Sequence, residues 1–139
     1  MKLSTKSDYA ARAVLSLARR FGRRQATPVE EIARENGAPP NYLVQILIEL
    51  KSGGIVRSLR GKSGGYVLAR PPSAITFADV LQCIHGTLLD SPAFKDDRCP
   101  AELRDAWMRL RRAVQEEAES INFQQLMDSG AGPARMFYI

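Results

Sequence analysis

The sequence predicts a mainly α-helical chain with one small β-hairpin. Several segments place apolar residues at three- and four-residue spacings between capping residues, proline or glycine, which is the pattern of amphipathic helices. One pair of short alternating segments flanks a glycine-rich turn, which indicates a hairpin. The chain has 139 residues, 45% hydrophobic and 25% charged, as one globular domain would. This composition excludes disordered, collagen-like and disulfide-scaffold proteins.

Three helices are predicted in the first half of the chain. The first covers residues 5–21, whose apolar side chains share one face. The second is capped by Thr27 and runs from Pro28, at the first helical position, to about Asn36, and Thr27 and Glu30 form a capping-box pattern. The third starts after Pro39-Pro40 and stops before Gly53-Gly54. Because a short link containing Gly37 joins the second and third helices, we expect a helix-turn-helix.

The predicted hairpin follows directly. Residues 55–59 and 66–69 form its strands, and the turn between them is basic and glycine-rich. A helix-turn-helix followed at once by such a hairpin is a winged helix. Nucleotide binding by a phosphate loop is disfavoured, because the turn lacks the upstream glycine at Walker spacing and a strand follows it. An ordinary hairpin turn with incidental charge is the remaining alternative.

Positive charge is concentrated in this part of the chain. Residues 1–72 hold 13 Lys and Arg against 5 Asp and Glu, whereas residues 73–139 hold 7 against 10. This distribution favours a polyanionic partner, although a solvated basic face would give the same count. For a winged helix that partner is double-stranded DNA, since the major groove admits a helix and the glycine-rich ribbon can approach the backbone or minor groove. The hairpin residues predicted to meet DNA are Arg57, Arg60, Lys62, Ser63 and Gly64.

A second region is predicted from residue 73 to 139, after Pro71-Pro72. Thr76 caps a helix that ends near Gly86, residues 87–99 form a loop, and a long helix follows from about 100 to 120. The long helix carries an apolar stripe from Leu103 to Ala118, more than one small core requires, so we expect a homodimer through it. Packing of this helix on its own domain is the alternative. A short last helix is predicted around residues 121–127, and residues 130–139 are too irregular for a prediction.

Three stretches of the sequence resemble the Rrf2 family of bacterial transcription regulators. They are residues 7–13 of the first helix, 41–47 of the third helix and 54–69 of the hairpin. The resemblance is specific over residues 1–86 and looser around the helix that contains Trp107. It implies a homodimeric winged-helix protein that binds a palindromic operator, and we expect it to act as a repressor.

The resemblance also implies roles for individual residues. Asn41, Tyr42 and Gln45 would face DNA, and Arg60 would enter the minor groove. Val44 stands where some members carry a glutamate that reads bases, so this chain departs from their pattern and its operator is not implied. The alternative function within the same chemistry is a non-specific or architectural DNA-binding protein.

A sensor is a further implication of the resemblance. Cluster-binding members carry three cysteines in the loop before the long helix, or fewer with auxiliary ligands, whereas this loop contains only Cys99. Because iron–sulfur ligands are chiefly thiolates, a cluster is disfavoured and no cofactor is expected. Asp8 lies where some members supply a carboxylate ligand, but an exposed helix-start aspartate is the simpler interpretation. Cys83 is expected to be a buried small side chain, and His85 a polar helix-end residue.

Cys99 has two other interpretations. It directly precedes the long helix, whose N-terminus favours a reactive thiolate, so it is a candidate redox switch. A Cys–His hydrolase using Cys99 and His85 is disfavoured, because no orienting group stands at a recognisable spacing. The sequence therefore predicts no enzyme. It has no apolar run of membrane-spanning length and no secretory leader, so we expect a cytoplasmic protein.

Overall fold

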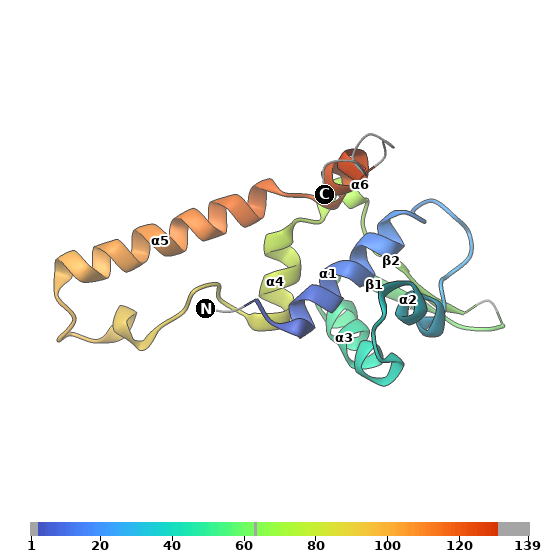
Figure 1. Ribbon diagram of the computed structural model, residues 1–139, viewed down its shortest axis with the longest axis horizontal. Coiled ribbons are helices and arrows are strands. Elements are labelled where there is room, and N and C mark those ends of the chain that lie inside the picture. The colour runs from blue at the N-terminus through green and yellow to red at the C-terminus, as the bar shows by residue number, and fades with distance from the viewer. Residues whose placement is uncertain (1–2, 63, 131–139) are drawn as a thin grey trace.

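The computed structural model describes residues 3–62 and 64–130, and Ser63 and the tail 131–139 lie outside the described residues. Within these residues the chain forms α-helices and one two-stranded antiparallel sheet, which lies at one end of the molecule, together with two short 3-10 turns, η1 and η2 (Figure 1). The elements are α1 (Thr5–Ala18), α2 (Val29–Asn36), α3 (Pro40–Ser52), β1 (Val56–Leu59), β2 (Gly65–Leu68), η1 (Pro72–Ala74), α4 (Phe77–His85), η2 (Pro92–Lys95), α5 (Ala101–Ser120) and α6 (Phe123–Gly130).

The helix-turn-helix forms as predicted, with two differences in detail. The first helix ends at Ala18 rather than residue 21, because the chain tightens into bonds from Arg20 N to Leu17 O and from Phe21 N to Ala18 O. The capping box predicted at Thr27 is wrong, since α2 begins after Pro28 without a side-chain cap. Thr27 is instead paired through its backbone with the hairpin.

Gly37 ends α2 and sets the angle of the turn. Its φ of 64° is left-handed, and the following residue, Ala38, donates its N–H to the carbonyl of Ala33 at 3.0 Å. Pro39 and Pro40 then start α3 within three residues of that end. The two helices are thus joined by the short link that the sequence predicts.

The hairpin is short and strictly paired. Val56 faces Leu68, and Leu59 faces Gly65, in an antiparallel register. Thr27 and Tyr66 exchange both backbone hydrogen bonds, at 3.0 and 2.9 Å, so the α1–α2 connection is attached to β2. Lys51 Nζ donates to Ser58 Oγ at 2.8 Å, which ties the other strand to α3. The hairpin is therefore held to the helices on both sides.

The main core lies between α1, α2, α3 and the hairpin, and α6 completes it. Phe123 of α6 is fully buried and lies 5.6 Å, ring to ring, from Phe77. Hydrogen bonds from Phe77 N to Ile121 O and from Phe123 N to Ile75 O hold α6 beside the start of α4. The capping box of Thr76 and Asp79 that begins α4 forms as the sequence predicts.

The long helix α5 projects away from this core (Figure 1). Near its C-terminal end, Ala118 is buried against Ala78 and Leu88. The stripe residues Leu103, Trp107 and Leu110 are 44%, 42% and 49% exposed in a single copy. The alternative that the whole stripe packs on its own chain does not describe this structure. None of the helices described in the structure is both long and apolar enough to cross a membrane.

Candidate nucleic-acid interface

The third helix has a buried face and an exposed face at the expected spacings. Its buried residues are Leu43, Ile46, Leu47 and Leu50. The predicted DNA-facing residues Asn41, Tyr42 and Gln45 are all exposed, with Tyr42 at 38%. The core thus fixes the rotation of α3 and leaves this polar face free.

Tyr42 is positioned by the first helix. Its ring meets the ring of Tyr9 edge to face, 6.0 Å between centroids. The Arg12 guanidinium lies 5.7 Å from the centre of the Tyr9 ring and donates to the carbonyl of Asn36 at 3.0 Å. Three helices therefore meet beside the start of α3, a contact between Tyr9 and Tyr42 that sequence periodicity did not reveal.

The hairpin is basic along β1 and at its tip. Arg57 on β1 and Arg60 and Lys62 in the turn are exposed, and none of them takes part in a salt bridge among the described residues. Gly64 is partly buried, and a Cβ there would lie 2.7 Å from the carbonyl oxygen of Leu59, so the turn has no room for a side chain. The predicted contact residue Ser63 lies outside the described residues. The tip is thus narrow, positively charged and close to its own backbone.

The end of α3 is anchored by α4 and α1. The thiol of Cys83 donates to the carbonyl of Glu49 at 3.1 Å, and Lys6 pairs with the Glu49 carboxylate at 2.7 Å. A Cβ on Gly53 would lie 2.6 Å from Cys83 Sγ, so the helix end and the thiol are in close contact. Burial, with the charge of Glu49 adding to it, raises the pKa of the Cys83 thiol. Cys83 packs partly buried against the core, in keeping with the small side chain expected there.

The candidate sensor residues have separate local partners. Asp8 forms an ion pair with Arg12 at 2.9 Å, and His85 Nε2 lies 3.0 Å from Ser4 Oγ. Cys99 is partly exposed, and its Sγ lies 3.7 Å from the carbonyl oxygen of Pro100. Among residues 3–62 and 64–130, no three His, Cys, Asp or Glu side chains gather as a metal site would require. The loop itself is braced by Arg111, which pairs with Asp90 and lies 3.7 Å over the Phe94 ring.

Comparison with known proteins identifies the fold. The family model described as "Rrf2: Iron-dependent Transcriptional regulator" matches residues 3–129. The chain belongs to the Rrf2 family. It is 36% identical over 141 residues to the HTH-type transcriptional regulator CymR of Bacillus subtilis, covering 100% of both chains. It is also 37% identical over 90 residues to the regulator IscR of Cereibacter sphaeroides, over 63% of this chain and 57% of that protein.

Solved structures of Rrf2 members agree. CymR, the global cysteine regulator of B. subtilis, superposes with a TM-score of 0.81 at 32% identity, covering 93% of this chain and 98% of that chain. IscR of T. potens superposes with a TM-score of 0.79 at 29% identity, over 99% and 97% of the two chains. The predicted winged-helix fold is confirmed. The chain is a DNA-binding transcription regulator, and the hydrolase alternative is wrong.

Proposed function

We propose that this Rrf2 member is a repressor that binds a palindromic operator as a homodimer. The observation that carries the proposal is that one chain presents both an exposed polar face on α3 and a basic hairpin turn, in which Gly64 leaves no room for a side chain. An α-helix fits the major groove, and a thin ribbon with arginine fits the minor groove beside it. Operator DNA would be met in the cytoplasm, which is the proposed site of action.

Each DNA-facing residue has a chemistry that suits its place. The side-chain amides of Asn41 and Gln45 can pair with base edges, and the Tyr42 hydroxyl can donate to phosphate. Arg60 is assigned to the minor groove, where its charge meets the strongest negative potential. The backbone of the duplex is assigned to Arg57, Lys62, Ser63 and Gly64.

The dimer is proposed to form through α5. Leu103, Trp107 and Leu110 lie at spacings of four and three residues, so they share one side of the helix. Their exposure of 42–49% leaves an apolar surface that a second copy can bury. A two-fold axis between two such helices would present two α3 helices to two half-sites, which explains why the operator should be palindromic. In this proposal residues 1–72 make the DNA contacts, and residues 73–139 supply dimerisation and sensing.

Sensing is assigned to the thiol of Cys99. Its partial exposure and its place directly before α5 leave it open to peroxide, which would convert the thiol to a sulfenic acid and release water. Asp8 is paired with Arg12, so we give it no cluster-binding role and propose no resident cofactor. Comparing operator affinity before and after peroxide, for the natural chain and for Cys99→Ser, tests this assignment. Identical responses of the two proteins would rule it out.

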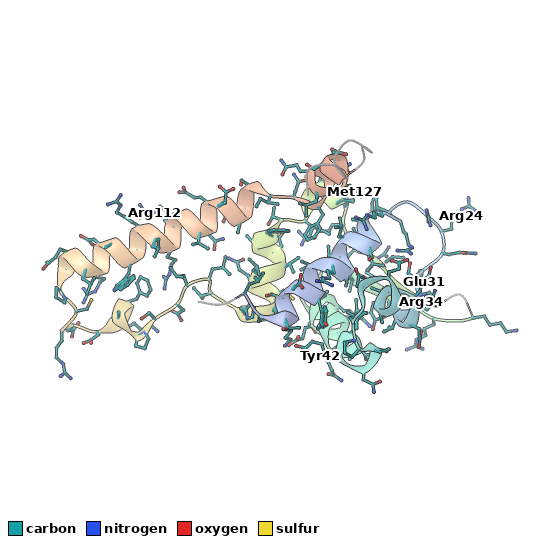
Figure 2. All side chains as sticks on the ribbon, viewed as in Figure 1. Arg24, Glu31, Arg34, Tyr42, Arg112 and Met127 are labelled. Carbon is teal, nitrogen blue, oxygen red and sulfur yellow. The ribbon has the colours of Figure 1, made fainter. Side chains whose placement is uncertain are left out.

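Operator binding is tested by selecting duplexes from a random pool and measuring affinity by fluorescence anisotropy at fixed salt. We expect an inverted repeat to be enriched, and Arg60→Ala to weaken its binding by at least about tenfold, as expected for one lost arginine–base contact. Arg112→Ala is the matched control, since Arg112 is an exposed arginine on α5 (Figure 2). A pool that shows no enrichment would favour the non-specific DNA-binding alternative.

A further inference from the structure

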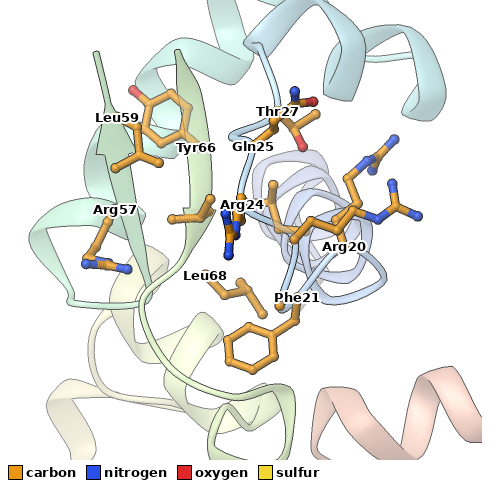
Figure 3. A pocket seen from close by; sticks show the side chains of 13 residues that line it. Arg20, Phe21, Arg24, Gln25, Thr27, Arg57, Leu59, Tyr66 and Leu68 are labelled. Carbon is orange, nitrogen blue, oxygen red and sulfur yellow. The ribbon is translucent and has the colours of Figure 1, made fainter. Parts of the chain in front are cut away.

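A pocket separate from the exposed face of α3 lies behind the wing, which is the β1–β2 hairpin. It has a volume of about 270 Å³ and opens between the α1–α2 turn and the hairpin (Figure 3). Phe21 and Arg24 line it from the turn, and Arg57, Leu59 and Leu68 line it from the strands. No residue of α3 belongs to its lining. The role proposed above for α3 therefore does not account for it, and among the described residues Arg57 is the one lining residue that the proposed DNA contacts also use.

The charge of the pocket is one-sided. Four arginines line it, Arg20, Arg23, Arg24 and Arg57, and no aspartate or glutamate does. The Arg20 guanidinium points away from the strands and pairs with Glu31 and Glu35 (Figure 3). Among the described residues, the other three arginines form no salt bridge. The pocket thus holds uncompensated guanidinium groups, which bind carboxylate, sulfate or phosphate groups well.

The pocket is also apolar, which separates it from a plain phosphate contact. Phe21 is 48% exposed although it is a large aromatic side chain, and Leu59 is 40% exposed. Figure 3 shows the Phe21 ring beside Leu68 at one end of the pocket and the guanidinium of Arg24 nearby. A DNA backbone offers these side chains only its sugars, whereas a small aromatic anion offers them a flat apolar ring. The volume lies near the lower end of the range for ligand pockets, roughly 300 Å³, so one ring suits it better than a larger ligand.

We propose that this pocket binds a small aromatic anion, one ring bearing a phosphate, sulfonate or carboxylate group. Arg24 and Arg57 hold the anionic group, and Phe21, which is 48% exposed, packs against the ring. Because Arg24 belongs to the α1–α2 turn and Arg57 to β1, the bound anion bridges the two segments across the paired backbones of Thr27 and Tyr66. The site shares Arg57 with the proposed DNA contacts, but its occupation by a small anion requires no DNA.

The test titrates phenyl phosphate, benzenesulfonate and benzoate separately into the isotope-labelled full chain and follows amide shifts by NMR without DNA. At least one of the three should bind saturably, with shifts centred on residues 21–27 and 57–68. Its affinity should exceed those of inorganic phosphate and benzyl alcohol by at least about tenfold each, since each control lacks one half of the interaction. Equal affinity for inorganic phosphate would mean a non-specific anion contact and would overturn the proposal, as would no saturable binding by any of the three.

Variants then locate the site. Arg24→Gln and Arg57→Gln should each weaken binding of the aromatic anion by about tenfold, the loss expected for one charge-assisted contact. Arg19→Gln removes the same charge from the same turn, but Arg19 does not line the pocket, so its affinity should stay within about twofold. An equal loss in all three variants would reduce the effect to net charge and refute the site.

Random duplex DNA provides the last arm of the test. If it shifts the pocket residues, and if the aromatic anions bind no better than inorganic phosphate, the pocket belongs to the DNA interface and the proposal fails. A saturable aromatic-anion site that the two pocket variants weaken would support the proposal, whether or not an operator is ever found. Circular dichroism and thermal unfolding of each variant confirm that the comparison is made between folded proteins.

Discussion

Gly65→Ala is expected to detach the wing from the helices. Gly65 begins β2 with a φ of 150°, and an added Cβ would lie 2.2 Å from the carbonyl oxygen of Thr27 and 2.7 Å from Pro28 N. Because both contacts are to backbone, the conflict cannot be relieved by a side-chain rotation. The segment around Thr27 must move away from β2.

The expected magnitude follows from what that movement breaks. The two hydrogen bonds between Thr27 and Tyr66 contribute about 1 kcal/mol each, and the unfavourable φ adds about 1 to 2 kcal/mol. Thr27 is only 4% exposed, so water does not readily replace the lost partners. The free energy of unfolding should therefore fall by about 3 to 4 kcal/mol.

Gly61→Ala separates the two contributions. Gly61 also has a positive φ, 109°, but a Cβ there would meet nothing within 4 Å. This control should lose only the conformational part, about 1 to 2 kcal/mol. Urea unfolding followed by circular dichroism, at one protein concentration for all three proteins, measures the difference. If Gly65→Ala costs no more than Gly61→Ala, the Thr27–Tyr66 pairing does not hold the wing.

Three further outcomes are expected. Trp107→Glu should raise the dimer dissociation constant by at least about 100-fold in sedimentation experiments, because a buried Trp contributes about 3 kcal/mol and a charge would replace it. The control Arg112→Glu, on the same helix, should leave the dimer intact. If both variants stay dimeric, α5 is not the interface. The raised pKa of Cys83 means that the unfolded chain loses its thiol proton first, so stability should fall as the pH rises above the ordinary thiol value of about 8.5. In Cys83→Ala this part of the slope should vanish, and urea unfolding between about pH 7.5 and 10 measures it. Finally, Gly53→Ala should destabilise the protein through its contact with Cys83, and the double variant Gly53→Ala/Cys83→Ala should recover part of that loss, because the added Cβ then no longer meets the sulfur.

The sequence predicts the local elements well, because their signals are local. Periodicity places α3 and exposes Asn41 and Gln45, and glycine spacing places the hairpin turn. Thr27 shows where local signals fail, since a capping pattern was present but backbone pairing with Tyr66, 39 residues further along the chain, prevailed. No pattern within a short window can report that competition.

For the same reason, the sequence predicts the site residues that lie within one element but not the contacts between distant segments. The exposed residues of α3 and the hairpin follow from their own elements. The pocket behind the hairpin was not predicted, because Arg24 and Arg57 lie on segments far apart in the sequence that the backbone pairing of Thr27 with Tyr66 brings together. The contact between Cys83 and the end of α3 was also missed, since it joins two helices separated by the hairpin.

The position of α4 constrains how a chemical change in the loop 87–99, such as the proposed oxidation of Cys99, could affect α3 of the same copy. The main contacts of α5 are with α4 and η2, while α4 also packs against α1 and α3. Ala78 of α4 is buried with Ala118 of α5, and further along α4 the Cys83 thiol donates a hydrogen bond to the carbonyl of Glu49. A rotation of α4 would therefore change both its contact with α5 and its contact with the end of α3. Because packed cores switch between discrete arrangements, a signal carried by α4 would require a second packing of this helix.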